Sequence, residues 1–466
     1  MALPTIRELL KSSGPKTGAV ARGWVKTRRD SKMLSFAELN DGSCRESLQV
    51  VFSQENGNFL EVLPSLVTGA AVEIQGDLIA SPAAGQKYEL QARLVRVYGG
   101  CDPEKYPIQK KRASDEFLRT VAHLRPRTNK YAAMLRIRAE LAYSVHKYFH
   151  DKGFFYVHTP IITASDGEGA GEMFTATTMD LSDLASLPRT DKGEIDFSKE
   201  LLGKKTYLTV TGQLEGESLA TALGKIYTFG PTFRAENSNT YRHASEFWMI
   251  EPEMAFYELE DDMELAEDFI KSITRSVLEK CPSDIELFAK FVEPALMDNL
   301  RNITENTFER LTYTDAVKLL EPVNERFDVK VSWGVDLASE HERFLVENYF
   351  KKPVILYNKP KEAAAFYMKL NDDGRTVRGM DVLVPRIGEV IGGSERENRL
   401  DVLEKKMAEA KIDPQTYWWY LDLRRYGSVP HSGFGLGFER MMMLITGISN
   451  IRDVTAFPRV PGYAEF

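Results

Sequence analysis

The first hundred residues alternate short apolar segments with turn signals, and this pattern restricts the fold more than any other feature of the chain. Turn sequences such as NDGS and SPAAGQ separate the apolar segments, as expected for strands joined by short connections. Five strands packed into so short a stretch predict a small barrel of the OB type over residues 1–101. The predicted strands are Ala19–Lys26, Leu34–Leu39, Leu48–Phe52, Ala71–Leu78 and Tyr88–Tyr98.

A charged, proline-containing segment follows this barrel. Residues 102–130 include Pro103, Pro107 and Pro126, which predicts a hinge. Tyr131–Asp151 then shows helical periodicity with few helix breakers. We therefore expect the chain to pass through a hinge and to enter a second domain.

The rest of the chain mixes helix and strand patterns. Strands predicted at Lys225–Phe229 and Phe247–Ile250 lie among helices such as Leu259–Lys280. A polar, irregular stretch near residues 182–204 predicts a surface insertion. We expect an α+β fold in which residues 131–466 form the second domain.

Composition excludes several classes of protein. The chain is 43% hydrophobic and 27% charged, which is typical of a globular protein. We find neither a long apolar run nor an N-terminal signal segment, so we expect a cytoplasmic protein without a membrane span. The three cysteines have no CxxC spacing, which argues against a disulfide framework or a zinc site.

Positive charge is concentrated at the front of the chain. The first 130 residues carry 20 Lys and Arg against 14 Asp and Glu, whereas the whole chain has a net charge of −8. This bias suits an N-terminal part of the chain that binds phosphate groups, although uneven composition alone would also produce it.

Two strand-like ends enclose a polar loop in the segment FRAENSNTYRHASEFWMIEPE. Arg234 lies at the end of the first strand, where its fork-shaped cation suits phosphate oxygens. Glu236 lies on the same face and can accept from an exocyclic amine. Arg242 and His243 can close over a polyphosphate, and Phe247 can stack on a base. The alternative is a surface hairpin with solvated charges.

A glycine-rich segment, HSGFGLGFER, ends on Arg440. Its glycines at 433, 435 and 437 alternate, so one face lacks side chains and can approach a flat ligand closely. Arg440 opens an apolar helix and can lie over an adenine ring. Tight packing of helix against strand would explain the same glycines.

Two acids stand in neighbouring predicted strands. Asp381 and Glu389 can together hold Mg²⁺, which takes few protein oxygens and otherwise binds water and phosphate. Arg396 follows them. Exposed strand ends are the alternative interpretation of these acids.

Taken together, these segments resemble a known family. FRAE with the downstream RHASEFWM resembles motif 2, and GLGFER resembles motif 3, of the class II aminoacyl-tRNA synthetases. GFFYVHTPII, over Gly153–Ile162, resembles motif 1, whose Pro160 belongs to the dimer interface in that family. With an OB barrel in front, the resemblance points to the aspartate, asparagine and lysine subgroup. It implies an antiparallel active-site sheet flanked by helices, and a homodimer.

The resemblance also implies roles for the residues named above. Arg234 would hold the α-phosphate of ATP, Glu236 the adenine amine, and Arg242 and His243 the outer phosphates, while Phe247 and Arg440 would enclose adenine. Asp381 and Glu389 would bind Mg²⁺. Arg234 and Arg440 are then the catalytic residues, because the substrate carboxylate is itself the nucleophile and the site positions it and neutralises phosphate charge.

The amino acid is indicated by the segment TGQLEGE. In aspartyl enzymes the matching segment resembles SPQLYKQ, whose Lys would fall on Gly216, so one cation for a substrate carboxylate is missing here. Arg396 can still donate to a carboxamide oxygen, while Glu217 or Glu251 can accept from its nitrogen. By the same resemblance, Gln213 lines this pocket, and Glu168, in the loop TASDGEGAGEMF, meets the α-ammonium.

The chain is most similar to the bacterial asparaginyl-tRNA synthetases, down to YWWY and LRRYGSVPHSGFGLGFER. It departs from them at Glu215, where Asn is expected. The resemblance implies that asparagine is activated with ATP and transferred to the 3′ end of tRNA(Asn). The alternatives are a non-discriminating aspartyl-tRNA synthetase, an ATP-dependent enzyme that makes free asparagine, and an inactive tRNA-binding paralogue.

The barrel resembles the anticodon-binding domain of that subgroup. Phe36 would stack on a splayed base, Gln49 and Glu89 would read base edges, and Arg28 and Arg29 would hold phosphates of the GUU anticodon. Alternation of apolar and polar residues does not show which face of a strand is exposed to solvent. The alternative is therefore that Phe36 packs in the barrel core.

Overall fold

The computed structural model describes residues 3–31, 33–53, 57–82, 85–109, 113–165, 167 and 173–466. The chain forms two compact units, Met1–Arg136 with Phe466, and Ile137–Glu465. Among the described residues, no helix is long and apolar enough to cross a membrane.

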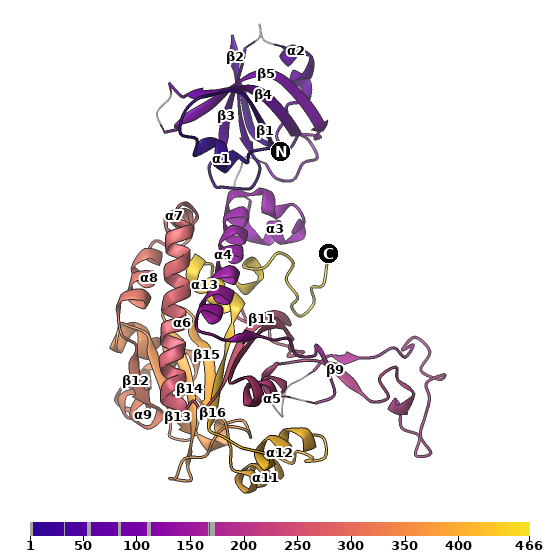
Figure 1. Ribbon diagram of the computed structural model, residues 1–466, viewed down its shortest axis with the longest axis vertical. Coiled ribbons are helices and arrows are strands. Elements are labelled where there is room, and N and C mark those ends of the chain that lie inside the picture. The colour runs from indigo at the N-terminus through magenta and orange to yellow at the C-terminus, as the bar shows by residue number, and fades with distance from the viewer. Residues whose placement is uncertain are drawn as a thin grey trace. The chain divides into compact units, whose positions relative to one another are not determined.

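The N-terminal unit contains a closed five-stranded barrel with the strand order β1-β2-β3-β5-β4, which confirms the predicted OB fold (Figure 1). Only β3 and β5 pair in parallel, and the other barrel neighbours are antiparallel. Buried side chains such as Val25, Leu39 and Leu90 form its core. The strands are β1 (Lys16–Asp30), β2 (Leu34–Asn40), β3 (Leu48–Ser53), β4 (Ala71–Ala80) and β5 (Tyr88–Gly99).

Short helices accompany the barrel. They are α1 (Ile6–Leu10), α2 (Phe59–Val62), η1 (Leu63–Ser65), α3 (Asp115–Thr120) and η2 (Arg125–Arg127). The segment predicted as a hinge is therefore partly helical, and Ser114 caps α3 by accepting from the Phe117 amide. The long helix α4 (Asn129–Asp151) follows.

An eight-stranded sheet forms the centre of the second unit, with the order β12-β13-β14-β15-β16-β11-β10-β6. Only the outer pairs β12–β13 and β10–β6 are parallel, as predicted for an antiparallel active-site sheet. The strands are β6 (Phe155–Tyr156), β10 (Lys225–Phe233), β11 (Glu246–Ala255), β12 (Glu309–Thr312), β13 (Val354–Pro360), β14 (Thr376–Val384), β15 (Gly388–Glu395) and β16 (His431–Gly437).

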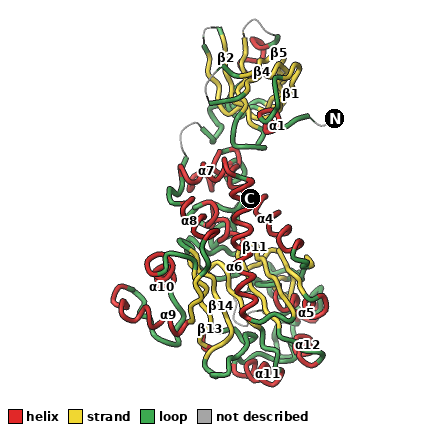
Figure 2. The backbone as a smooth tube through the Cα atoms, turned by 60° about the vertical axis from the view of Figure 1, so that its left-hand side comes forward, coloured by secondary structure: helices red, strands yellow, loops and turns green. Residues whose placement is uncertain are grey.

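Helices pack against this sheet, as the tube view shows (Figure 2). The helix α6 (Leu259–Lys280) contacts β14, β15 and β16 through residues such as Met263, Phe269 and Ile273, whose spacing places them on one apolar face. The other helices are α5 (Gln213–Leu223), α7 (Pro282–Phe291), α8 (Leu296–Glu305), α9 (Tyr313–Leu320), α10 (Ser339–Arg343), α11 (Leu400–Glu409), α12 (Trp418–Arg425), α13 (Phe438–Thr446), the 3₁₀ turns η3 (Phe197–Lys199), η4 (Glu321–Arg326), η6 (Lys361–Ala363) and η7 (Ile451–Asp453), and the π-helix η5 (Phe344–Tyr349).

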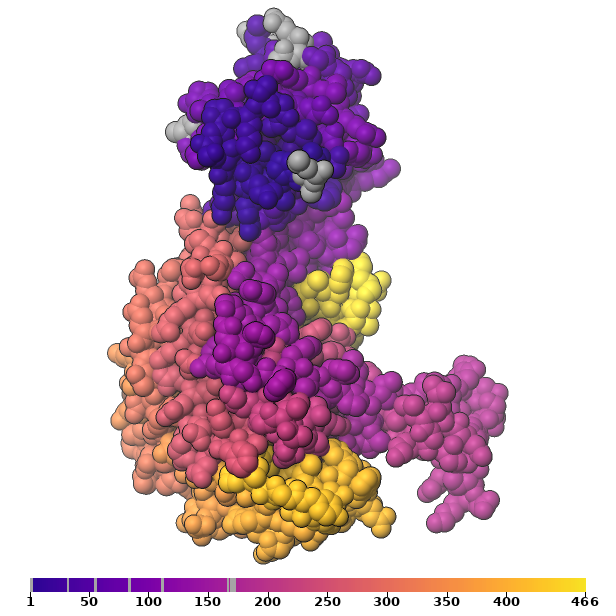
Figure 3. All heavy atoms as spheres, viewed as in Figure 1, coloured from indigo at the N-terminus to yellow at the C-terminus, as the bar shows by residue number. Residues whose placement is uncertain are grey.

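A small three-stranded sheet, β7 (Ile162–Thr163), β9 (Thr206–Leu208) and β8 (Thr175–Ala176), flanks the main one. The segment between β8 and β9, which includes residues 182–204, projects from the body of its unit (Figure 3). It consists mainly of exposed turns, which fits its polar composition.

Candidate functional site

Antiparallel pairing of β10 with β11 builds one wall of the site. Phe233 faces Glu246 across the pair, so Arg234 and Phe247 lie at the two ends of the connecting loop. The guanidinium carbon of Arg234 lies 5.6 Å from the centre of the Phe247 ring. Because side chains alternate along a strand, Phe247, Met249, Glu251 and Glu253 all point to the same face of β11.

Two adjoining cavities open on this face. The loop cavity, of about 130 Å³, is lined by the predicted set Arg234, Glu236, Arg242, His243, Phe247, Glu389 and Arg440. The sheet cavity, of about 520 Å³, is lined by Gln213, Glu251, Glu253, Lys359, Asp381 and Arg396 among others. They share Arg234, Glu236, Met249, Glu389 and Gly435, so a ligand can extend from one into the other.

Hydrogen bonds fix the polar groups of the loop cavity. Arg440, in the first turn of α13, donates to the backbone oxygen of Glu389 at 3.1 Å and lies 3.3 Å from its carboxylate. His243 Nδ1 lies 2.5 Å from Thr240 Oγ1, and burial together with the charge of Arg440 lowers the pKa of its ring. Arg242 is tied to Ser339 Oγ at 2.6 Å and to the Ile387 carbonyl, so it lies at the cavity edge.

Two carboxylates converge where β14 and β15 pair. Asp381 faces Gly392, and a Cβ on Gly392 would lie 3.2 Å from Glu389 Oε1 and 3.7 Å from Asp381 Oδ1. Burial and the neighbouring Glu389 raise the pKa of Asp381 to about 6, while Lys359, at 2.7 Å, opposes the shift. Burial also works against ionisation of Glu389, but Arg440 and Lys359 together hold its pKa below the usual range.

This cradle fits Mg²⁺, which takes few protein oxygens and completes its shell with water and phosphate. Within the described ranges, no group of three or more His, Cys, Asp and Glu side chains is arranged to hold a metal ion. A metal at Asp381 and Glu389 would therefore need phosphate oxygens, and it would compete with the ammonium of Lys359.

A buried ion pair forms the far end of the sheet cavity. Arg396 contacts Glu253 through two hydrogen bonds, Nη2 to Oε1 at 2.5 Å and Nε to Oε2 at 3.2 Å, and it donates to Ser394 Oγ at 2.8 Å. Glu253 faces Gly433, where a Cβ would lie 2.4 Å from the carboxylate, so only glycine leaves room for this pair. Burial raises the pKa of Glu253, and the Arg396 guanidinium opposes that shift.

Position 216 lies beside this pair. A Cβ on Gly216 would be 3.6 Å from Cγ of Glu253 and 3.4 Å from Ile226 Cδ1. A lysine at this position would therefore start in contact with Glu253, whereas the glycine leaves Arg396 as the cation that faces it.

Glu217 and Glu251 are both held by the protein. Glu217 is fully buried and accepts from Arg424, Tyr420 and Gln213 at 2.8–3.0 Å, with His431 Nε2 at 2.9 Å. It does not line the sheet cavity, so the structure does not bring it to a ligand. Glu251 lines that cavity and accepts from the Gly212 amide and Thr228 Oγ1, both at 3.0 Å.

Sequence reasoning missed Glu253 as a residue that lines the sheet cavity, although its period-two spacing from Phe247 and Glu251 places it on their face. Lys359, Tyr420 and Arg424 carried no local signal, because their partners lie far away in sequence. Glu168 lies outside the described residues. Glu215 is half-buried and lines neither cavity, and burial raises its pKa.

On the barrel, Phe36 is half-buried and stands outside the core cluster. The Arg29 guanidinium lies 5.0 Å from its ring centre. Gln49 donates to Glu89 at 3.1 Å, since β3 and β5 bring the two side by side. The Arg28 guanidinium lies 3.2 Å from the Asp30 carboxylate and donates to the Leu66 carbonyl at 3.2 Å.

The motif 1 segment presents apolar side chains on the surface of its unit. Phe155 and Tyr156 on β6 are each 55% exposed, and Ile161 and Ile162 are nearly as exposed. Contiguous exposed apolar side chains are typical of a protein contact surface.

Comparison with known proteins gives consistent matches along the whole chain. The family described as tRNA synthetases class II (D, K and N) matches residues 114–461, and the OB-fold nucleic acid binding domain matches residues 19–98. The chain is 56% identical to an asparagine–tRNA ligase from Nostoc sp. and 55% identical to one from Nitratidesulfovibrio vulgaris, over 99% of each chain.

Solved structures agree with these relatives. The crystal structure of asparaginyl-tRNA synthetase from Pyrococcus horikoshii complexed with asparaginyl-adenylate aligns with a TM-score of 0.86 at 31% identity, over 100% of this chain and 99% of that one. The asparaginyl-tRNA synthetase of Entamoeba histolytica in complex with asparaginyl-adenylate aligns with a TM-score of 0.83 at 26% identity, over 100% of this chain and 99% of that one.

Proposed function

The chain belongs to the asparagine–tRNA ligases of the class II tRNA synthetases, and from this premise we propose how its own residues carry out the reaction. The enzyme activates asparagine with ATP to asparaginyl-adenylate and transfers the asparaginyl group to the 3′ end of tRNA(Asn). The buried Glu253–Arg396 pair in the sheet cavity is the observation that carries the choice of asparagine.

The loop cavity holds ATP in this proposal. Arg234 binds the α-phosphate, where its fork matches a pair of oxygens and stabilises the charge that develops on attack. Phe247 and Arg440 enclose adenine, and Glu236 accepts from its amine. His243, and Arg242 from the cavity edge, face the outer phosphates.

Asp381 and Glu389 hold Mg²⁺ beside these phosphates. When bound, the ion neutralises phosphate charge. Lys359 balances the Asp381 carboxylate in its absence.

Asparagine occupies the sheet cavity. Arg396 donates to the carboxamide oxygen and Glu253 accepts from its nitrogen, so a neutral side chain meets an already balanced ion pair. Aspartate would bring a second carboxylate against Glu253, with no lysine at position 216 to compensate. Glu251, Gln213 and the loop residue Glu168 surround the α-ammonium. Gly216 leaves space beside the Glu253–Arg396 pair. Glu217 does not line the cavity and holds the residues around it in place.

The barrel binds the anticodon in this proposal. Phe36 stacks on a base, Gln49 and Glu89 read base edges, and Arg29 reaches phosphate. Arg28, tied to Asp30, supports this face. The exposed motif 1 surface around Pro160 forms a symmetric dimer contact, and the enzyme works in the cytoplasm.

Amino-acid-dependent ATP–pyrophosphate exchange, measured with asparagine and aspartate side by side, tests this function. Exchange with asparagine alone is expected, and tRNA charging should follow. Exchange with aspartate at a similar kcat/KM would contradict the carboxamide pocket and favour a non-discriminating aspartyl enzyme. Free asparagine formed without tRNA would favour the amide-forming alternative.

A further inference from the structure

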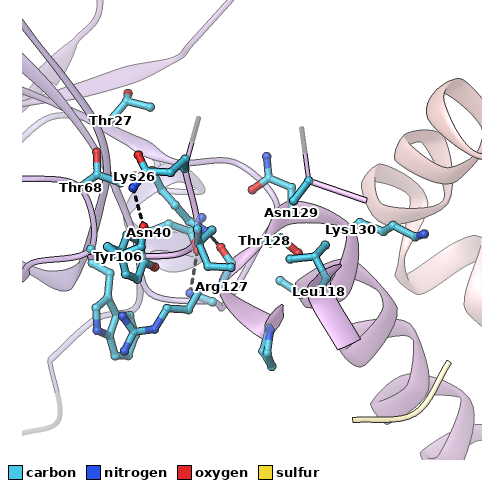
Figure 4. A pocket seen from close by; sticks show the side chains of 18 of the residues that line it. Lys26, Thr27, Asn40, Thr68, Tyr106, Leu118, Arg127, Thr128, Asn129 and Lys130 are labelled. Carbon is cyan, nitrogen blue, oxygen red and sulfur yellow. Dashed lines mark hydrogen bonds between the residues drawn. The ribbon is translucent and has the colours of Figure 1, made fainter. Parts of the chain in front are cut away.

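A third cavity lies within the N-terminal unit. This junction cavity, of about 1060 Å³, is lined on the barrel side by Trp24, Lys26 and Asn40, and on the other by Tyr106, Arg127 and Asn129 (Figure 4). Neither Phe36, Gln49 nor Glu89 lines it. Its volume is ample for one nucleotide, since clefts of a few hundred Å³ hold ligands of that size.

Two cations of this cavity, Lys26 and Arg127, lie close enough for their charges to interact. Lys26 donates to the backbone oxygen of Arg127, and neither side chain forms an ion pair with any described residue. Both are half-buried. Burial, then the charges of Arg136 and Arg127, lower the pKa of Lys26, and Glu38 opposes this only in part.

Two carboxylates also line this cavity, namely Glu38, which offsets part of the positive charge at Lys26, and Asp115. Lys130 pairs with Asp115 at 2.6 Å, so that carboxylate is not available to Lys26. Two half-buried cations side by side are unfavourable unless an anion joins them. The junction cavity is therefore prepared for a negatively charged group.

Aromatic rings flank the same cations. The Arg127 guanidinium lies 5.9 Å from the Trp24 ring and 5.8 Å from the Tyr106 ring, and Trp24 is 43% exposed. A cation beside exposed aromatic faces suits the two parts of a nucleotide, because its phosphate pairs with the cation while its base stacks.

We propose that the junction cavity binds one nucleotide of the tRNA outside the three anticodon bases, with its phosphate at Lys26 and Arg127 and its base against Trp24 or Tyr106. This rests on the proposed function, which supplies tRNA as the ligand. A free mononucleotide carries the same chemistry, so the test separates the two sources.

The test compares Lys26→Gln with the control Lys105→Gln in the full-length enzyme. Lys26→Gln should weaken tRNA(Asn) binding about tenfold and lower the slope of log K against log salt by about one unit, because one phosphate contact is lost. Lys105→Gln should change neither, since Lys105 pairs with Asp102 and does not line the cavity. ATP–pyrophosphate exchange with asparagine should stay unchanged in both, which shows that the protein is folded.

Phosphate-ethylation interference on the tRNA then locates the contact. The wild-type enzyme should show an interfering phosphate outside the anticodon that disappears with Lys26→Gln. Equal tRNA affinities for both variants and the wild type would overturn the proposal. So would AMP or UMP binding, measured by calorimetry, that Lys26→Gln abolishes while tRNA binding stays intact. Absence of asparagine-dependent exchange in the wild type would instead refute the proposed function.

Discussion

Glu253→Gln tests the buried ion pair that we propose as the asparagine reader. The substitution preserves shape and one acceptor oxygen but removes the negative charge beside Arg396. Glu253 is 1% exposed and Arg396 3% exposed, so water cannot replace the lost interaction. The carboxamide nitrogen then loses a charge-assisted hydrogen bond.

Hydrogen bonds to charged groups contribute about 1.5–3 kcal/mol. At about 1.4 kcal/mol per factor of ten, kcat/KM for asparagine should fall about 10- to 150-fold. Aspartate should gain, because its carboxylate no longer meets Glu253 and finds Arg396 unpaired. The ratio of the two kcat/KM values should therefore change more than either value alone.

The assay is ATP–pyrophosphate exchange with each amino acid, together with thermal unfolding to show that the variant is folded. Glu215→Gln is the matched control, because Glu215 is a half-buried acid on α5 that lines neither cavity. It should leave the asparagine-to-aspartate ratio unchanged. A folded Glu253→Gln enzyme with asparagine kcat/KM within twofold of wild type would refute the reasoning.

Four further predictions concern single positions. Arg234→Ala should lower exchange about 100- to 1,000-fold with unchanged thermal unfolding, and near-normal exchange would remove Arg234 from the α-phosphate. Phe36→Ala should weaken tRNA binding about 5- to 150-fold and spare exchange, whereas loss of both would assign its ring to packing. Gly216→Lys should lower kcat/KM for asparagine about tenfold and raise kcat/KM for aspartate. Gly216→Ala should change neither value, because its Cβ would lie at ordinary contact distance from its neighbours. Equal effects of the two variants would show that the change is steric. Burial lowers the pKa of Lys406 to about 8, so the unfolded chain binds this proton more tightly than the folded protein does. The free energy of unfolding should therefore rise between about pH 8 and 10.5, and Lys406→Met should remove this rise. An unchanged pH profile of the variant in denaturant titrations would contradict this.

Much of the fold could be predicted from local pattern. The five barrel strands and the strands predicted at Lys225–Phe229 and Phe247–Ile250 follow from short apolar runs separated by turn sequences. The structure extends most of them by a few residues, since ladder hydrogen bonds continue past the apolar runs.

Only part of the candidate site could be predicted from local sequence. Arg234, Glu236, His243 and Phe247 are close in sequence, so one hairpin brings them together, and the chain itself indicated their chemistry. Which acid meets Arg396 could not be predicted in this way. Glu253 and Arg396 are 143 residues apart and meet only through the register of β11, β16 and β15.

The sequence by itself determined the barrel, the antiparallel sheet, the family and the class of reaction, because these depend on local periodicity and on motifs whose members lie close together. The tertiary structure alone decided that Glu253 pairs with Arg396, that Glu217 pairs with Arg424 and His431, and that Lys26 and Arg127 line one cavity. Pairing in a buried, low-dielectric interior depends on distances between remote segments, and strand register sets those distances.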